Sequence, residues 1–109
     1  MANEPDVHST LSTRGSTHGD FKQNGSLMQH LKEVCRGEHG WIKLSPYQAE
    51  AIDMICHKLG RILCGDPNFT DHWHDIAGYA TVVESILTTG NSYPIKVSNT
   101  STINDRTGN

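Results

Sequence analysis

Apolar residues recur at helical spacing through the middle of this chain, in segments separated by turn-forming residues. The pattern predicts helices over about residues 26–36, 46–64 and 70–88. Gly37, Gly65 and Gly90 follow the last periodic residue of each segment, a position where glycine commonly ends a helix. The pattern therefore predicts an all-α fold, a compact bundle of three or four helices.

The segment 46–64 carries the most complete helix signals. Ser45 is the expected N-cap, Pro46 stands at the first helical position, and Gln48 completes a capping box. At about 100° per residue, one face is apolar and consists of Ile52, Ile55, Cys56, Leu59, Ile62 and Leu63. The opposite face is polar and consists of Glu50, Asp53, His57 and Arg61, with Lys58 at its border.

The segment 70–88 is also amphipathic, and we expect Thr70 or Asp71 to cap it. Its apolar face consists of Trp73, Ile76, Ala80, Val83 and Leu87. Asp71 and Asp75 are four residues apart on a second stripe, so their carboxylates can converge. Gly78 lies one turn further on, where the missing side chain would let a neighbour or a ligand approach the backbone.

The ends of the chain lack this periodicity. Residues 1–12 are polar and are predicted to be a flexible lead-in, and residues 91–109 a flexible polar tail. Residues 13–90 would form a single helical domain, in which residues 13–24 are an ordered loop or the start of a helix. In that loop Arg14 and His18 are either solvated or fold over a ligand. With 35% hydrophobic residues the core is small, so we expect a homo-oligomer.

Composition excludes several classes of function. The 9 Lys and Arg are outnumbered by 12 Asp and Glu, and no basic stripe is present, which argues against nucleic-acid binding. No apolar run is long enough to span a membrane, and the N-terminus lacks the features of a signal peptide. Three cysteines without a framework pattern indicate reduced thiols, so we expect a cytoplasmic protein.

The acidic residues of the two longer helices suggest a metal site. If the helices pair, four carboxylates could gather around one hard cation such as Mg²⁺, namely Glu50, Asp53, Asp71 and Asp75. Lys58 and Arg61 lie one to two turns along and could bind substrate phosphates. Tyr79 flanks the aspartates and could contact a base or ribose.

Two other interpretations stay open. In a tight helical hairpin, Arg61 lies about as far from the connecting turn as the two aspartates do. An Arg61–Asp75 or Lys58–Asp71 salt bridge could therefore simply pin the helices together. Alternatively, Lys58, Arg61 and the aspartates could bind a ligand directly, without a metal. The cysteines are best explained as core residues.

The segment AEAIDMICHKLGRILCGDPNFTDHWHDIAGYATVV and the upstream RGSTHGDFKQN carry a resemblance. They are similar to a group of small phage and prophage proteins with R-G-x-x-H/Y-G-D-F and D-x-W-x-D-I-x-G-Y-A motifs, over roughly residues 13–83. More distantly, the chain resembles the MazG-like all-α nucleoside triphosphate pyrophosphohydrolases, which hold Mg²⁺ with two acidic pairs. Glu50 and Asp53 match the first pair, whereas Asp71 and Asp75 are spaced four residues apart instead of three.

These resemblances imply a phage nucleotide-handling protein. Its leading form would be a Mg²⁺-dependent nucleotide phosphohydrolase, with Asp75 and Glu50 as catalytic candidates and Lys58 and Arg61 neutralising phosphate charge. The first alternative is a non-catalytic binder that sequesters a nucleotide signal of host defence. The second is a structural or regulatory adaptor without a small ligand.

Overall fold

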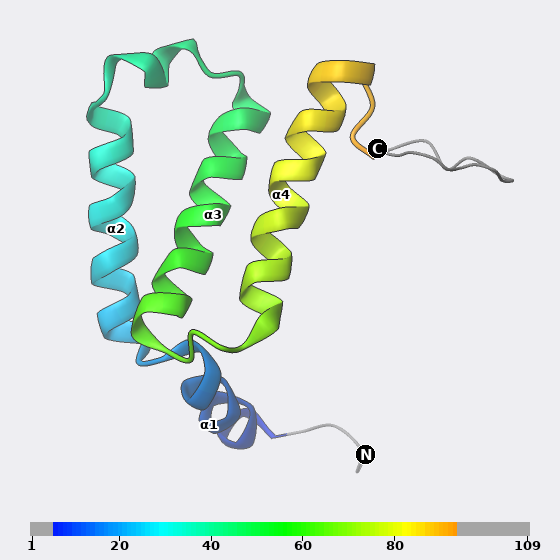
Figure 1. Ribbon diagram of the computed structural model, residues 1–109. Helices are drawn as coiled ribbons and strands as arrows, with labels where there is room; N and C mark the ends of the chain where they lie inside the picture. The colour runs from blue at the N-terminus through cyan, green and yellow to red at the C-terminus, as the bar shows by residue number, and fades with distance from the viewer. Residues whose placement is uncertain (1–5, 94–109) are drawn as a thin grey trace, which may run out of the picture.

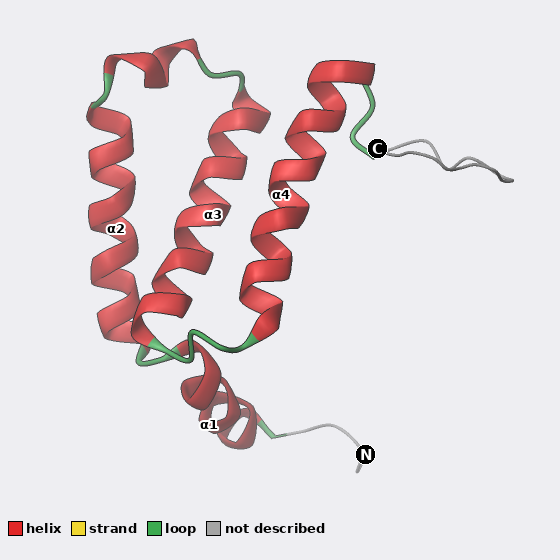
Figure 2. Ribbon diagram, viewed as in Figure 1, coloured by secondary structure: helices red, strands yellow, loops and turns green. Residues whose placement is uncertain are grey.

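The computed structural model describes residues 6–93, and they form one chain of helices (Figures 1 and 2). The elements in order are α1 (Val7–His18), α2 (Phe21–Gly37), the short 3-10 helix η1 (His39–Lys43), α3 (Pro46–Cys64) and α4 (Thr70–Thr89). No strand occurs within the described residues. The predicted all-α class is therefore confirmed.

Three of the helices lie side by side in a single layer. In Figure 1, α3 runs between α2 and α4, and α1 crosses below the end of the layer where α3 ends and α4 begins. α3 packs against α2, α4 and α1, so it is the central element of the fold. None of the described helices has the length and apolar character needed to cross a membrane.

The ends of α3 and α4 follow the predicted signals closely. The backbone N–H of Ser45 donates to Gln48 Oε1 at 2.9 Å, which is half of the expected capping box. Gly90 ends α4 in the left-handed conformation, with φ of 80°, and its N–H donates to the carbonyl of Ile86. The N-cap of α4 is Phe69, one residue before the predicted position.

The N-terminal part differs from the prediction. Helix α1 occupies residues expected to be a lead-in and a loop, and α2 begins at Phe21 instead of residue 26. Asp6 and Asp20 cap these two helices by accepting hydrogen bonds from the backbone N–H of His8 and Gln23. α1 buries no residue, so hydrophobic periodicity carried no signal for it. Of the predicted tail over 91–109, residues 94–109 lie outside the described residues.

The layer has two different sides because α2 and α4 pack on opposite flanks of α3. The buried apolar residues are Met28, Ala51, Cys56 and Ile62. Helical spacing then places most of the other apolar residues of these three helices on one broad side, here called the apolar side. It consists of Leu27, Leu31 and Val34 of α2, Ile52, Ile55, Leu59 and Leu63 of α3, and Ile76, Ala80, Val83 and Leu87 of α4.

The opposite, polar side carries most of the predicted site residues. It consists of Lys32 and Arg36 of α2, Glu50, Asp53, His57 and Arg61 of α3, and Asp71, Asp75 and Gly78 of α4. The predicted contrast between the two faces of α3 is therefore present. Its apolar face, however, is left open, because the neighbouring helices pack on the flanks.

Candidate functional site

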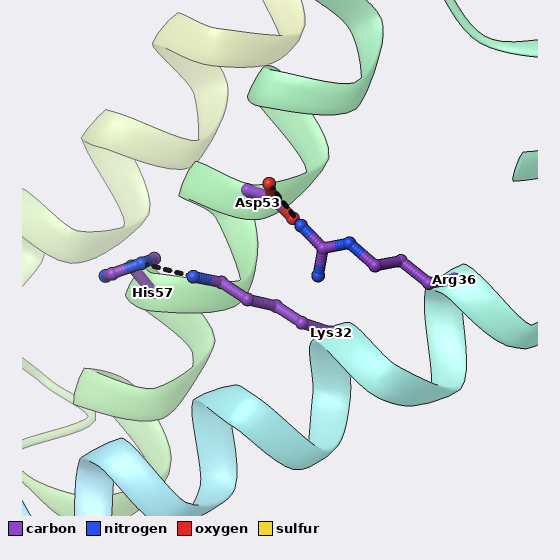
Figure 3. Close-up of polar contacts among 4 residues, drawn as sticks. All are labelled: Lys32, Arg36, Asp53 and His57. Carbon is purple, nitrogen blue, oxygen red and sulfur yellow. Dashed lines mark hydrogen bonds and ion pairs between the residues drawn. The ribbon is translucent and has the colours of Figure 1, made fainter.

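Two side-chain contacts tie α2 to α3 on the polar side (Figure 3). Arg36 Nη2 lies 2.8 Å from Asp53 Oδ2, and Lys32 Nζ lies 2.9 Å from His57 Nε2. Lys32 and Arg36 are one helical turn apart, as are Asp53 and His57, so the contacts form two successive rungs. Both cations of α2 thus reach toward the polar face of α3.

An ion pair ties α3 to α4. Lys58 Nζ lies 2.8 Å from Asp75 Oδ2, and the Lys58 side chain is only 9% exposed, whereas that of Asp75 is 42% exposed. The hydrogen bond from Lys58 is the main cause that lowers the pKa of Asp75 below its ordinary value. The helix-pinning interpretation is supported, but with different partners: neither Arg61–Asp75 nor Lys58–Asp71 is the pair that forms.

His57 lies in a cationic environment. Its Nε2 faces an ammonium, so it accepts a hydrogen bond from Lys32 when the ring is neutral. Burial is the largest cause that lowers the pKa of His57, and the charges of Lys32 and Arg61 add to it, while Asp53 acts in the opposite direction. His57 is therefore a neutral base among cations.

A second histidine lies at the end of α1. His18 Nδ1 is 2.6 Å from the hydroxyl of Thr17, and its ring packs edge-on against His72, with 4.7 Å between the ring centroids. Burial lowers the pKa of His18, and the nearby charges of Arg61, His72, Arg14 and Lys58 lower it further, in that order. His18 and Arg14 of α1 therefore face the same region as Arg61 of α3.

Backbone contacts hold α1 in this position. The carbonyl of Thr17 accepts the N–H of Asp66 at 3.0 Å and lies 3.1 Å from Nε2 of His72. A Cβ on Gly65 would come within 2.5 Å of the Thr17 carbonyl oxygen, and one on Gly19 within 2.2 Å of a carbonyl oxygen of α3. The two turns fit together only because these positions have no side chain.

The four predicted metal ligands are not gathered at one point. Asp53 contacts Arg36 on the α2 flank, Asp75 contacts Lys58 on the α4 flank, and Glu50 and Asp71 are exposed. Glu50 also precedes Lys58 by eight residues, which is about 12 Å along the helix axis. Within residues 6–93, no group of three or more His, Cys, Asp or Glu side chains is close enough to share a metal ion.

Two further expectations concern α4. Nothing lies within 4 Å of a Cβ built on Gly78, so no neighbour among the described residues approaches its backbone, and the approach of a ligand stays a prediction. Tyr79 is half-buried on α4, one turn after Asp75, and its contact with a base or ribose stays a prediction. The cations of α2 were not predicted as site residues, although Lys32 and Arg36 follow helical spacing on one side of an amphipathic segment and could have been found from it.

Searches among known proteins return no similar protein. No family model, no curated protein and no solved structure matches the chain. The function must therefore be argued from the site itself.

Proposed function

We propose that this protein binds a nucleotide, or a small molecule derived from one, through its phosphate groups on the polar side of the layer. The observation that carries the proposal is the position of Arg61, which lies one turn after His57 on the polar face of α3 and takes part in no ion pair among the described residues. Lys32 Nζ adds a second cation 2.9 Å from His57 Nε2, and the charges of Arg61 and Arg14 both act on His18. The nearby aspartates are engaged by other cations of the chain, Asp53 by Arg36 and Asp75 by Lys58. The region therefore keeps positive charge available for a ligand.

The available groups suit a phosphate. In the described part of the chain Arg61 takes part in no ion pair, and its guanidinium can form two parallel hydrogen bonds to a phosphate. Lys32 contributes a point charge, and an approaching phosphate would favour the protonated, donating forms of His18 and His57. Phosphate binding would thus remove the repulsion among these cations.

Polar groups beside the cations suit the rest of a nucleotide. Oδ1 of Asp53 has no hydrogen-bond partner among the described residues, but it is covered by its neighbours, so a ligand hydroxyl such as that of a ribose would reach it only after the Arg36 side chain moves. Tyr79 is the aromatic residue that we propose for contact with a base. Among the alternatives from the sequence, these features favour non-catalytic binding.

Mg²⁺-dependent hydrolysis stays a prediction with less support. It requires Glu50 and Asp75 to act on one phosphate chain. Asp75, however, is paired with Lys58, and Glu50 lies about two turns before Lys58 on α3. A phosphate chain would have to bridge that distance, or a second copy would have to complete the site.

The test is equilibrium binding of a panel of mono-, di-, tri- and cyclic nucleotides, measured by calorimetry in the absence of metal. We expect Arg61→Ala to weaken binding of the best nucleotide by about 10- to 100-fold, the loss of one or two charged hydrogen bonds. The matched control is Lys43→Ala, which removes an exposed cation at the opposite end of α3 and should change nothing. Binding should also weaken as salt rises.

Two outcomes would contradict the proposal. One is a panel in which no nucleotide binds, and the other is an Arg61→Ala variant that binds as well as the Lys43→Ala control. Adding Mg²⁺ and separating the products by chromatography reads hydrolysis in the same samples. Turnover that disappears in Asp75→Asn would favour the hydrolase instead.

A further inference from the structure

The apolar side of the layer is not covered by any part of the chain that the structure describes. Val34 of α2, Leu63 of α3 and Leu87 of α4 all lie on this side, and they are 56%, 68% and 63% exposed. Each belongs to a different helix, so the exposure extends across the whole layer. Monomeric proteins seldom leave contiguous apolar surface of this extent open to water.

A groove runs between α3 and α4 on the same side. Its volume is about 470 Å³, and its walls are formed mainly by Ala51, Ile52, Ile55, Ala80, Val83 and Leu87. Gln48 and Glu84 are polar residues at its lining, and no Lys or Arg contributes to it. The groove is thus an apolar depression between the two helices, with Leu44 and Leu87 in its lining.

We propose that the apolar side is the interface of a homodimer, in which the layers of two copies stack face to face. In a twofold interface the same surface of each copy meets its counterpart on the other copy. That surface must therefore contain both projections and depressions. The apolar side does so, because Leu63 and Val34 protrude while the α3–α4 groove is hollow. The resulting dimer would be a two-layer arrangement of six long helices with a continuous core.

The size of this side agrees with that of a stable interface. Helices of 17 to 20 residues are about 25–30 Å long, and three helices packed at about 9 Å span a width of about 28 Å. The side therefore offers roughly 800 Å², close to the area that each partner of a typical stable complex buries. The monomer, in contrast, has only four buried apolar residues in the described part of the chain, Met28, Ala51, Cys56 and Ile62.

The distribution of charge favours a second copy over a lipid surface. Helices that lie on membranes usually carry Lys and Arg around their apolar face, where these meet anionic headgroups. Here Lys32, Arg36 and Arg61 are on the opposite side, Lys58 is buried beside Asp75 of α4, and Glu84 is the charged residue at the groove. Stacking two copies also leaves both polar sides facing outward, so the proposed ligand sites stay accessible.

The experiment is sedimentation equilibrium of the full chain over a range of concentrations. Wild-type protein should have twice the 12.0 kDa mass of one chain. Leu87→Glu and Leu63→Glu change exposed residues of the apolar side and should raise the dissociation constant about 100-fold or more, because each change occurs twice in the dimer. Thr81→Glu changes an exposed residue of α4 on the outer edge of the layer and should leave the dimer intact.

Circular dichroism measures the helix content of each variant, because dissociation is informative only for a variant that stays folded. Wild-type protein that stays monomeric at every concentration would overturn the proposal. So would Thr81→Glu dissociating the dimer as strongly as Leu87→Glu, or a monomer that co-sediments with phosphatidylcholine and phosphatidylglycerol vesicles. These outcomes are independent of nucleotide binding, so either proposal can fail without the other.

Discussion

Removing the carboxylate of Asp75 tests how α3 and α4 are held together. In Asp75→Ala the ammonium of Lys58, with a side chain only 9% exposed, would lose its partner and stay between the two helices. Breaking a fully buried pair from one side costs about 3–5 kcal/mol, and breaking an exposed pair costs at most about 1 kcal/mol. Asp75 itself is 42% exposed, so water can replace part of the lost interaction. We therefore expect a loss of about 1–3 kcal/mol.

Thermal unfolding measures this loss. For a domain of this size, 1 kcal/mol corresponds to a shift of about 4–8 °C in the melting temperature. The matched control is Asp71→Ala, which removes an exposed aspartate one turn earlier on α4 and should cost at most about 1 kcal/mol, mostly through the helix dipole. The ligand conditions and the protein concentration must be the same for both variants.

A double variant separates the buried charge from the contact itself. Lys58→Met combined with Asp75→Ala removes both charges while keeping an unbranched side chain between the helices, and stability should return to within about 1 kcal/mol of wild type. A double variant as unstable as Asp75→Ala would contradict the role of the Lys58–Asp75 pair in holding α3 and α4 together. Equal melting temperatures for Asp75→Ala and Asp71→Ala would also contradict it.

The same pair predicts an acid dependence with a definite sign. Lys58 lowers the pKa of Asp75 below its ordinary value of 3.8, so the contribution of the pair is fully present above that pH. It is lost as the pH falls below 3.8 through the folded-state pKa. The gap in stability between wild type and Asp75→Ala should close over that interval, as measured by urea unfolding at a series of pH values.

Three other predictions follow from single positions. Gly65→Ala should destabilise the fold by about 2 kcal/mol or more, since its Cβ would lie 2.5 Å from the Thr17 carbonyl oxygen, and urea unfolding would show it. Gly78→Ala places a methyl group in open space within a helix, and should raise stability by about 0.5–1 kcal/mol in the same assay. His57 has a lowered pKa, so the unfolded chain binds more protons near its ordinary value of 6.5, and stability should fall as the pH drops below 6.5. His57→Gln should make that part of the pH dependence disappear, and an unchanged pH profile would contradict the assignment.

Local signals decided which segments of this chain became the long helices. Ser45, Pro46 and Gln48 define the start of α3, and Gly90 defines the end of α4, because capping depends on residues a few positions apart. The same local signals do not predict α1. It has an aspartate cap but buries no side chain, and a short helix without an apolar face leaves no periodic pattern to detect.

The composition of the two sides of α3 was also visible in the sequence, whereas the partners of its side chains were not. Helical spacing places Asp53, His57 and Arg61 on one side whatever surrounds them. Which cation each acid meets depends on the relative depth of neighbouring helices and on the flank that each occupies. The predicted gathering of four carboxylates required α3 and α4 to meet polar face to polar face, and the layer brings them together flank to flank instead.

The sequence alone thus determined the helical class, the limits of α3 and α4, and an amphipathic pattern with charged residues of both signs along one stripe of α3. These properties arise from interactions within a few turns of one helix. Only the tertiary structure decided that Lys58 meets Asp75, that α2 contributes Lys32 and Arg36, and that the apolar side lies open. Those features depend on how whole helices are placed beside each other, which short-range periodicity does not specify.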